Sequence, residues 1–196
     1  MKIVAFNGSP RKGGNTQLLL QEAVKGALDA GADITVYDLN WMNIHPCQNC
    51  GGCAETGRCV VPDDMQKVHE EIRTADRIIL ASPIFFFGLS GQSKIMIDRC
   101  QPFWYEKYIR MKPVPAGPQG RKGLLLLVGG MKRSPRNKGF ECSEVTARAF
   151  FRTINVPEHA TLSYDGVDKK GAVLEHPTAL KEAYEAGKTL VAALRL

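Results

Sequence analysis

The sequence predicts an α/β fold in which a mainly parallel sheet of five strands is covered by helices on both faces. Short apolar segments alternate along the chain with amphipathic segments of helical periodicity, which is the pattern of repeated strand–helix–strand units. The longest apolar runs, residues 78–81 and 124–128, are short enough to be single strands. Such alternation makes consecutive strands parallel and places helices over both faces of the sheet.

The expected elements follow one another in strict alternation. The first strand ends in a Gly-rich turn that leads into a helix, and a Pro-rich stretch at residues 111–120 precedes the fourth strand. The expected strands span residues 2–6, 33–38, 77–82, 123–128 and 160–164. The expected helices span residues 16–30, 63–74, 91–100, 141–153 and 178–194. This order fits the flavodoxin-like fold with strand order 2-1-3-4-5, and we expect one domain over residues 1–196 because no segment is typical of a linker.

Composition and charge argue against a membrane protein and against a nucleic-acid site. Hydrophobic residues make up 44% of the chain, and no apolar run approaches the roughly 18 residues of a membrane span. A strand begins at the second residue with no leader before it, so we expect a cytoplasmic protein. The formal charge is +6, with basic clusters only at Arg11-Lys12 and residues 132–138. These clusters predict either a solvated face or attraction of a phosphate-bearing cofactor.

A Gly-rich turn between the first strand and the first helix predicts an anion site. Its sequence over residues 7–16, Asn-Gly-Ser-Pro-Arg-Lys-Gly-Gly-Asn-Thr, would expose backbone N–H groups at a helix N-terminus. The candidate anion ligands are Ser9, Arg11, Gly14, Asn15 and Thr16. A plain turn and helix cap is the alternative, but ligands of open parallel sheets bind at this position, beyond the carboxyl end of strand one. The spacing matches neither a dinucleotide nor a triphosphate fingerprint, which leaves the phosphate of a mononucleotide.

The loop after the third strand predicts a site for a flat aromatic ring. Three consecutive phenylalanines at 85–87 are costly to expose. They either pack into the core or an oligomer interface, or they wall an isoalloxazine ring together with the backbone of the loop. The candidate ring-binding residues are Pro83, Ile84, Phe85, Phe86 and Gly88, with Gly129 as a third wall after the fourth strand. For the loop that follows residue 129, a mobile basic surface loop is the alternative.

Four of the six cysteines lie within thirteen residues and predict a metal site. Cys47, Cys50, Cys53 and Cys59 have the spacing C-x2-C-x2-C-x5-C in a Gly-rich loop. Disulfides are disfavoured in the cytoplasm, and soft thiolates at this density can hold a compact metal cluster. Structural zinc is the alternative, although zinc more often uses two separated C-x2-C pairs. Cys100 and Cys142 lie outside the run and are expected to be packing residues.

Three motifs in this order carry a resemblance to a known family. The turn after strand one follows the pattern G-S-P-R-x-x-G-N-T, with an additional Gly at its second variable position, and the cysteine run is followed by Val-Val-Pro-Asp-Asp-Met. Residues 82–99 follow S-P-x-Y-F-x-x-x-S-x-x-x-K-x-x-I-D-R, with Phe85 in place of the Tyr. The chain thus resembles the iron–sulfur flavoprotein and NADPH-dependent FMN reductase family of the flavodoxin-like superfamily, by motif over residues 1–100 and by architecture beyond them. Asp98 and Arg99 are expected to form a surface ion pair or a helix-end charge.

The resemblance implies an enzyme that binds FMN and moves electrons through it. The four clustered cysteines would hold a 4Fe–4S cluster that exchanges electrons with FMN. The implied electron donor is ferredoxin or NAD(P)H, and the acceptor is a small oxidant such as oxygen or hydrogen peroxide. Cluster and flavin would communicate between subunits of a homodimer or homotetramer, and the aromatic segment 101–120 suits a subunit contact better than a core helix. No side chain need act as a catalytic base.

Two other functions remain open from the sequence. One is an NAD(P)H-dependent FMN or quinone reductase in which the cysteines are idle. The other is a non-enzymatic electron carrier or a zinc-stabilised binding module. The flavin and metal contents of the protein distinguish all three functions.

Overall fold

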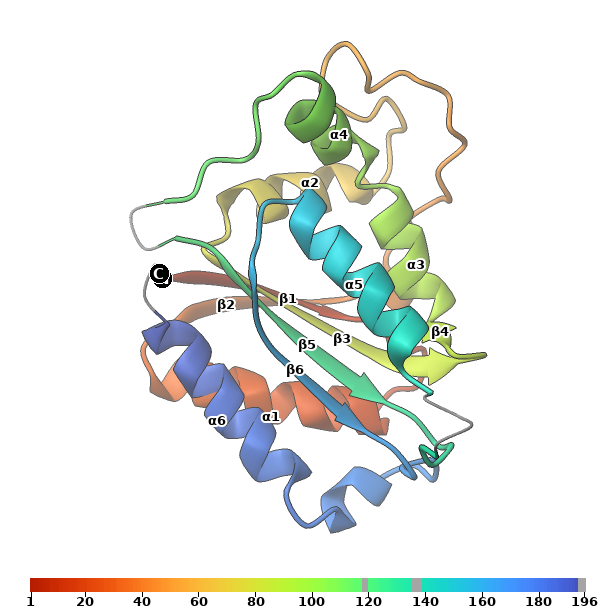
Figure 1. Ribbon diagram of the computed structural model, residues 1–196, viewed down its shortest axis with the longest axis vertical. Coiled ribbons are helices and arrows are strands. Elements are labelled where there is room, and N and C mark those ends of the chain that lie inside the picture. The colour runs from red at the N-terminus through yellow and green to blue at the C-terminus, as the bar shows by residue number, and fades with distance from the viewer. Residues whose placement is uncertain (118–119, 135–138, 194–196) are drawn as a thin grey trace.

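The sheet in a computed structural model of the chain has the predicted topology. The structure describes residues 1–117, 120–134 and 139–193. Its parallel strands are β1 (Lys2–Asn7), β2 (Asp33–Asp38), β3 (Arg77–Phe85), β5 (Lys122–Val128) and β6 (Glu158–Tyr164). They lie in the order β2-β1-β3-β5-β6 (Figure 1). Counted as parallel strands only, this is the order 2-1-3-4-5, so the predicted flavodoxin-like fold is confirmed.

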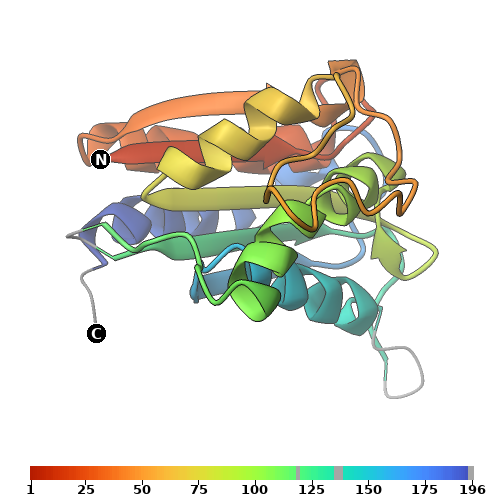
Figure 2. The same ribbon diagram turned by 90° about the horizontal axis from the view of Figure 1, so that it is seen from above.

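A layer of helices covers each face of the sheet (Figure 2). The helices α1 (Asn15–Asp29) and α6 (Ala179–Ala192) pack on one face. The helices α2 (Met65–Thr74), α3 (Gly91–Asp98) and α5 (Glu141–Thr153) pack on the other. Alternate strand residues enter opposite layers, so that in β1 Val4 and Phe6 pack beneath α2 while Ile3 and Ala5 pack beneath α1. Burial on both faces explains why the central strands are apolar throughout.

The predicted helices and strands occur close to their expected bounds. A few positions of the predicted segments lie outside the residues that the structure describes. The expected last residue of the final helix, Leu194, is one of these. So are residues 118–119 of the Pro-rich stretch and residues 135–138 of the second basic cluster. Two short 3-10 helices, Leu39–Trp41 and Ala172–Glu175, were not expected.

The third strand is longer than predicted and ends in a hairpin. β3 continues past residue 82 to Phe85 and pairs with the two-residue antiparallel strand β4 (Gly88–Leu89), with Ile84 opposite Leu89. The hydroxyl of Ser82 accepts a hydrogen bond from the backbone of Ser90 at 3.0 Å, which closes the hairpin at its base. The loop predicted at this position is therefore a β-hairpin with an aromatic tip.

The expectation that residues 101–120 are not a core helix is wrong for their first half. The chain forms α4 (Gln101–Trp104) and continues as a π-helical segment, Tyr105–Ile109. Phe103 is buried in the core, and its ring packs edge-on against His69 with centroids 5.5 Å apart. Only part of the aromatic stretch, including Trp104 and Tyr108, stays exposed. A helix can bury one aromatic and expose the next because its side chains point around the axis.

Two buried arginines hold the helix ends at the amino side of the sheet. Arg77 donates to the carbonyls of Leu190 at 2.8 Å and Ala193 at 2.6 Å, at the end of α6. Arg121 donates to the last carbonyls of α2 and α5. These bonds satisfy carbonyl groups that a helix leaves unpaired at its C-terminus. Burial lowers the pKa of Arg121 to about 10, so the guanidinium is still charged at neutral pH.

None of the helices among the described residues combines the length and the apolar character needed to cross a membrane.

Candidate functional site

The turn between β1 and α1 leaves the N-terminus of that helix open to an anion. Gly14 is the N-cap residue and supplies no side-chain cap, and the first turn of α1 contains no acidic residue. The backbone N–H of Leu18 makes a bond of the helical type, to the carbonyl of Gly14 at 3.0 Å. The N–H groups of residues 15–17 precede it and have no partner within the helix. Together with the helix dipole, they form a positive end that suits a phosphate group.

The side chains of this turn mainly shape the loop. Ser9 is buried, and its hydroxyl accepts from the backbone N–H of Arg11 at 3.2 Å. The side chain of Asn15 donates to the carbonyl of Lys169 at 2.8 Å and so ties the turn to the loop after β6. Thr16 is buried, whereas Arg11 is exposed and donates to the carbonyl of Asp168 at 3.5 Å. An anion at this site would therefore be held mainly by backbone N–H groups and by the charge of Arg11.

The phosphate turn and the hairpin after β3 are joined by buried hydroxyls. Ser90 caps α3 by accepting from the backbone N–H of Ser93 at 3.2 Å, and its hydroxyl donates to the carbonyl of Gly8 at 2.6 Å. A side chain at Gly8 would lie only 1.8 Å from the hydroxyl of Ser93. Only glycine at position 8 therefore permits the hydrogen bond between Ser90 and the Gly8 carbonyl. This bond fixes the two loops relative to each other. Ser93 was not among the predicted residues.

Two neighbouring cavities form a cleft between the phosphate turn and the aromatic hairpin. One cavity, of about 160 Å³, lies beside Ser9, Arg11, Gly14 and Asn15. A second and mainly apolar cavity, of about 350 Å³, lies between the hairpin and residues 129–131. Ile84, Phe85 and Gly130 line both cavities. The combined volume is within the range of small-molecule sites in proteins.

The hairpin tip is strained and exposed. Phe86 and Phe87 have φ angles of 49° and 62°, in the left-handed region that bulky residues rarely adopt. Phe85, Phe86 and Phe87 are all exposed, and Phe86 is fully so. The alternative in which these rings pack into the core of the chain is therefore wrong. Strain of this kind is concentrated at ligand sites.

The structure places most of the predicted ring-binding residues around the second cavity. Ile84, Phe85, Phe86 and Gly129 line it, and Pro83 lines the first cavity. Gly88 pairs with Phe85 in the hairpin and does not line either cavity among the described residues. A side chain on Gly129 would lie 3.0 Å from the ring of Phe140. Glycine at this position therefore lets the ring of Phe140 pack closely against the backbone.

Several residues that line the cleft were not among the site residues predicted one by one. Met131 and Phe140 contribute to the apolar cavity. Val167 and Asp168, after β6, contribute to the cavity beside the phosphate turn. The rule that ligands bind beyond the carboxyl ends of strands applies to the last strand as well. It could have identified Val167 and Asp168.

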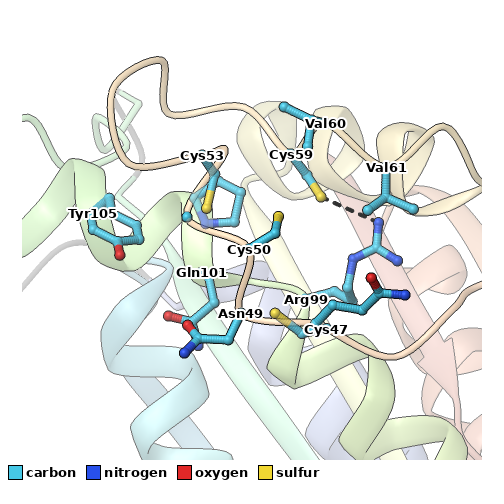
Figure 3. A pocket seen from close by; sticks show the side chains of 13 residues that line it. Cys47, Asn49, Cys50, Cys53, Cys59, Val60, Val61, Arg99, Gln101 and Tyr105 are labelled. Atoms are coloured by element: carbon cyan, nitrogen blue, oxygen red, sulfur yellow. Dashed lines mark hydrogen bonds between the residues drawn. The ribbon is translucent and has the colours of Figure 1, made fainter.

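The four clustered cysteines lie around one small pocket, which Arg99 at the end of α3 and Gln101 of α4 also line (Figure 3). Cys47, Cys50, Cys53 and Cys59 are all free thiols and all line it. Burial raises the pKa of Cys53; its own backbone hydrogen bond lowers it, and the other three cysteines raise it further. Among the described residues, no three His, Cys, Asp or Glu side chains converge closely enough to hold a single metal ion.

A buried ion pair closes the base of the cysteine loop. Arg99 and Asp63 are each 1% exposed, and Nη1 of Arg99 lies 2.6 Å from Oδ2 of Asp63. Burial alone would raise the pKa of Asp63, but hydrogen bonds from Arg99 and from the backbone of His45 and Met65 lower it. Arg99 is therefore not the surface or helix-end charge that was expected. Asp98 does form a surface pair, with Lys94 at 2.7 Å.

The remaining two cysteines differ from each other. Cys100 is buried beside Met96, as predicted for a packing residue, and burial raises the pKa of its thiol. Cys142, near the start of α5, is exposed, so the prediction that it packs in the core is wrong.

The residues present fit FMN at the cleft. An uncapped helix N-terminus suits the phosphate, and an apolar cavity bounded by exposed rings suits the isoalloxazine ring. The cysteine pocket also has a suitable donor set, because its four thiols surround the pocket and each iron of a cluster takes one thiolate. As the loop lies, however, the pocket holds only about 20 Å³. Two of the four cysteines, Cys47 and Cys50, are exposed.

Comparison with known proteins identifies the family. Residues 1–160 match the family model described as NADPH-dependent FMN reductase. An iron-sulfur flavoprotein of Methanocaldococcus jannaschii is 38% identical over 102 residues, which are 52% of this chain and 53% of the relative, so the match spans about half of that protein. An iron-sulfur flavoprotein of Methanosarcina thermophila is 30% identical over 138 residues, 70% of this chain and 68% of the relative.

The fold also occurs in solved structures. An NAD(P)H:quinone oxidoreductase from Methanothermobacter marburgensis superposes with a TM-score of 0.74, at 18% identity, over 97% of this chain and 98% of that one. At this identity the likeness concerns the fold alone. The family is established by the sequence match over residues 1–160: the chain belongs to the NADPH-dependent FMN reductase family.

Proposed function

We propose that this protein is a flavin-dependent oxidoreductase that binds FMN in the cleft between the phosphate turn and the aromatic hairpin. The observation that carries the proposal is the adjacency of two cavities that share lining residues, one beside the uncapped N-terminus of α1 and one between the hairpin and residues 129–131. The first suits an anion and the second a flat apolar ring. Bound FMN would supply hydride and electron transfer.

The protein side chains would bind and orient the cofactor. The N–H groups of the first turn of α1 and Arg11 would hold the phosphate, and Ile84 and Phe85 would lie along the ring where the two cavities meet. The exposed rings of Phe86 and Phe87 would shield the ring from water. The family makes NAD(P)H the proposed electron donor.

Titration of the flavin-free protein with FMN and with riboflavin tests this proposal. Flavin fluorescence should be quenched by both ligands, and FMN should bind at least tenfold more tightly because only FMN carries the phosphate. Equal affinities would contradict the phosphate site. No binding of either ligand would contradict the proposal as a whole.

We propose further that the four clustered cysteines hold a 4Fe–4S cluster. The support is their placement around one pocket and the names of the relatives in M. jannaschii and M. thermophila. A bound cluster would supply one-electron transfer. The close spacing of the cysteines favours a cluster over structural zinc, which more often uses two separated C-x2-C pairs.

The second candidate function is an NAD(P)H-dependent flavin or quinone reductase in which these cysteines bind no metal. The small volume of the cysteine pocket, about 20 Å³, favours it. Metal analysis and a visible spectrum of protein purified without oxygen separate the two functions. Iron and sulfide with a broad iron–sulfur absorption support the cluster, whereas flavin bands alone, with NAD(P)H able to reduce the flavin, support the second candidate.

A further inference from the structure

Arg99 lies at the point where the cysteine loop meets the body of the fold. Its backbone ends α3, with its N–H bonded to the carbonyl of Ile95 at 3.1 Å. Its side chain is 1% exposed and lines the pocket formed by the four clustered cysteines. Among the described residues that line this pocket, Arg99 is the only one with a permanent charge.

The guanidinium of Arg99 contacts both ends of the cysteine loop. Nη1 donates to the carbonyl of His45 at 2.6 Å, just before the first cysteine. Both terminal nitrogens donate to Asp63, just after the last cysteine, at 2.6 and 2.9 Å. Asp63 in turn accepts from the backbone of His45 at 2.9 Å. One buried pair therefore fixes both ends of the loop that carries the thiols.

The same guanidinium also touches a predicted metal ligand. Nη2 of Arg99 donates to Sγ of Cys59 at 3.4 Å, the contact drawn as a dashed line in Figure 3. In addition, Nε of Arg99 is buried and has no hydrogen-bond partner among the described residues. A buried N–H without an acceptor costs free energy unless a ligand satisfies it.

A purely structural role does not require these charges. Replacing a buried ion pair by apolar side chains of similar size is often neutral or stabilising. An apolar contact would therefore be enough to close the loop. The bond to sulfur and the unused Nε–H are the features that an apolar pair could not provide.

We propose that Arg99 is a positioning residue for the cysteine site, which orients Cys59 through an N–H···S bond and stabilises the negative charge of the metal-bound thiolates. This inference rests on the proposed 4Fe–4S cluster. Hydrogen bonds to ligand sulfurs raise the reduction potential of a cluster, because the reduced form carries one more negative charge. Asp63 neutralises the pair as a whole, so the effect arises from the N–H in contact with sulfur.

The test measures the reduction potential of the cluster in protein reconstituted without oxygen. Arg99→Met removes the donor, and Arg99→Lys keeps the charge but not the planar fork. The matched control is Arg73→Met. Arg73 also holds the loop, by donating to the carbonyl of Gly57 at 3.0 Å, and does not line the cysteine pocket. Iron per chain, FMN content and circular dichroism are recorded for every variant.

We expect Arg99→Met to shift the equilibrium for cluster reduction about tenfold toward the oxidised form, which is about 59 mV for a one-electron couple. Arg99→Lys should recover part of the shift, and Arg73→Met should stay near the wild type. Since Arg99→Met leaves Asp63 buried without its partner, the double variant with Asp63→Asn repeats the measurement if the single variant does not fold.

The outcomes separate the inference from the proposed function. Loss of iron from folded Arg99→Met, but not from Arg73→Met, would also support the role of Arg99 as a positioning residue. The expected shift in reduction potential would support the same role. Wild-type protein that binds no iron would overturn the proposed cluster and this inference with it. A wild-type cluster whose potential is unchanged in the Arg99 variants, or shifted equally by Arg73→Met, would overturn the inference alone.

Discussion

Gln17 shows how a single residue can separate helix stability from ligand binding. It occupies the third position of α1, and its side-chain oxygen accepts from the backbone N–H of Gly13 at 2.7 Å. Gln17→Glu keeps this acceptor and adds a negative charge beside the positive end of the helix. That charge should stabilise the helix by about 0.3–1 kcal/mol but repel a bound phosphate.

We therefore expect Gln17→Glu to weaken FMN binding about tenfold and to leave riboflavin binding unchanged. Fluorescence titration of both ligands measures the effect. Gln21→Glu, one turn further along the same helix, is the matched control and should change neither affinity. An equal loss of FMN and riboflavin binding would show that the phosphate lies elsewhere.

Phe87 illustrates strain at the second part of the site. Its φ angle of 62° favours glycine, and the residue is 48% exposed, about as much as Phe85. Phe87→Gly should therefore destabilise the flavin-free protein by about 1–2 kcal/mol less than Phe85→Gly does, as measured by urea denaturation. The same variant should bind FMN more weakly because one wall of the apolar cavity is lost.

Phe85→Gly is the control for this prediction. Phe85 lies in β3 and is not among the residues with positive φ, so glycine relieves no strain there. This variant should lower the free energy of unfolding and also weaken FMN binding. If Phe87→Gly destabilises the protein as much as Phe85→Gly, the left-handed backbone is not costly in this hairpin.

At the scale of elements, the strands and most helices could be predicted because their burial repeats along the chain. The extension of β3 could not, because it depends on a bond between Ser82 and Ser90 and on a strand of only two residues. The helix at residues 101–109 was missed because Pro102 and a run of aromatics resemble an irregular contact segment. In the structure Pro102 stands in the first turn of α4, where proline is tolerated.

Arg121 connects two of these helices and should be costly to replace. Its side chain is 3% exposed and bonds to the carbonyls of Ala75 at 3.1 Å and Ile154 at 2.6 Å, and also to that of Ile72. Arg121→Met would leave these buried carbonyls without donors, so the free energy of unfolding should fall by about 3 kcal/mol or more. Denaturant unfolding measures the loss.

The control for Arg121 is Arg148→Met on α5. The side chain of Arg148 is 50% exposed and pairs with Glu144 and Glu158 at 3.3 Å. Exposed pairs contribute little, so this change should stay within about 1 kcal/mol. A similar loss for both arginines would contradict the role given to buried carbonyl bonds.

At the scale of the whole molecule, the candidate cleft could be located from the sequence because strand order alone fixes where the carboxyl ends of β1 and β3 meet. The side of the cleft formed by Val167 and Asp168 was not located from the sequence, because these residues belong to a loop without a recognisable motif. Arg99 was misjudged for a related reason. Its burial depends on Asp63, 36 residues away, and a helix-end Arg beside an Asp resembles a solvated charge in sequence.

His69 gives the packing between the sheet and the cysteine loop a pH dependence. It is 4% exposed, and its Nε2 lies 2.9 Å from the carbonyl of Arg99, to which the neutral ring donates. Burial lowers the pKa of His69; the bond to the Arg99 carbonyl raises it in part, and the charges of Arg73 and Arg99 lower it further. Below about pH 6.5, the ordinary pKa of histidine, His69 is protonated in the unfolded chain but stays neutral in the folded chain until the pH reaches its lowered pKa.

The free energy of unfolding should therefore be highest above about pH 6.5 and should fall as the pH decreases from there toward the lowered pKa of folded His69. His69→Gln keeps an N–H donor and removes the titration, so stability should depend less steeply on pH in this window, even if the variant is less stable overall. His45→Gln changes an exposed side chain and should keep the wild-type slope. An unchanged slope in His69→Gln would mean that other groups control the acid stability, since the slope at each pH counts only the protons that the unfolded chain binds in excess.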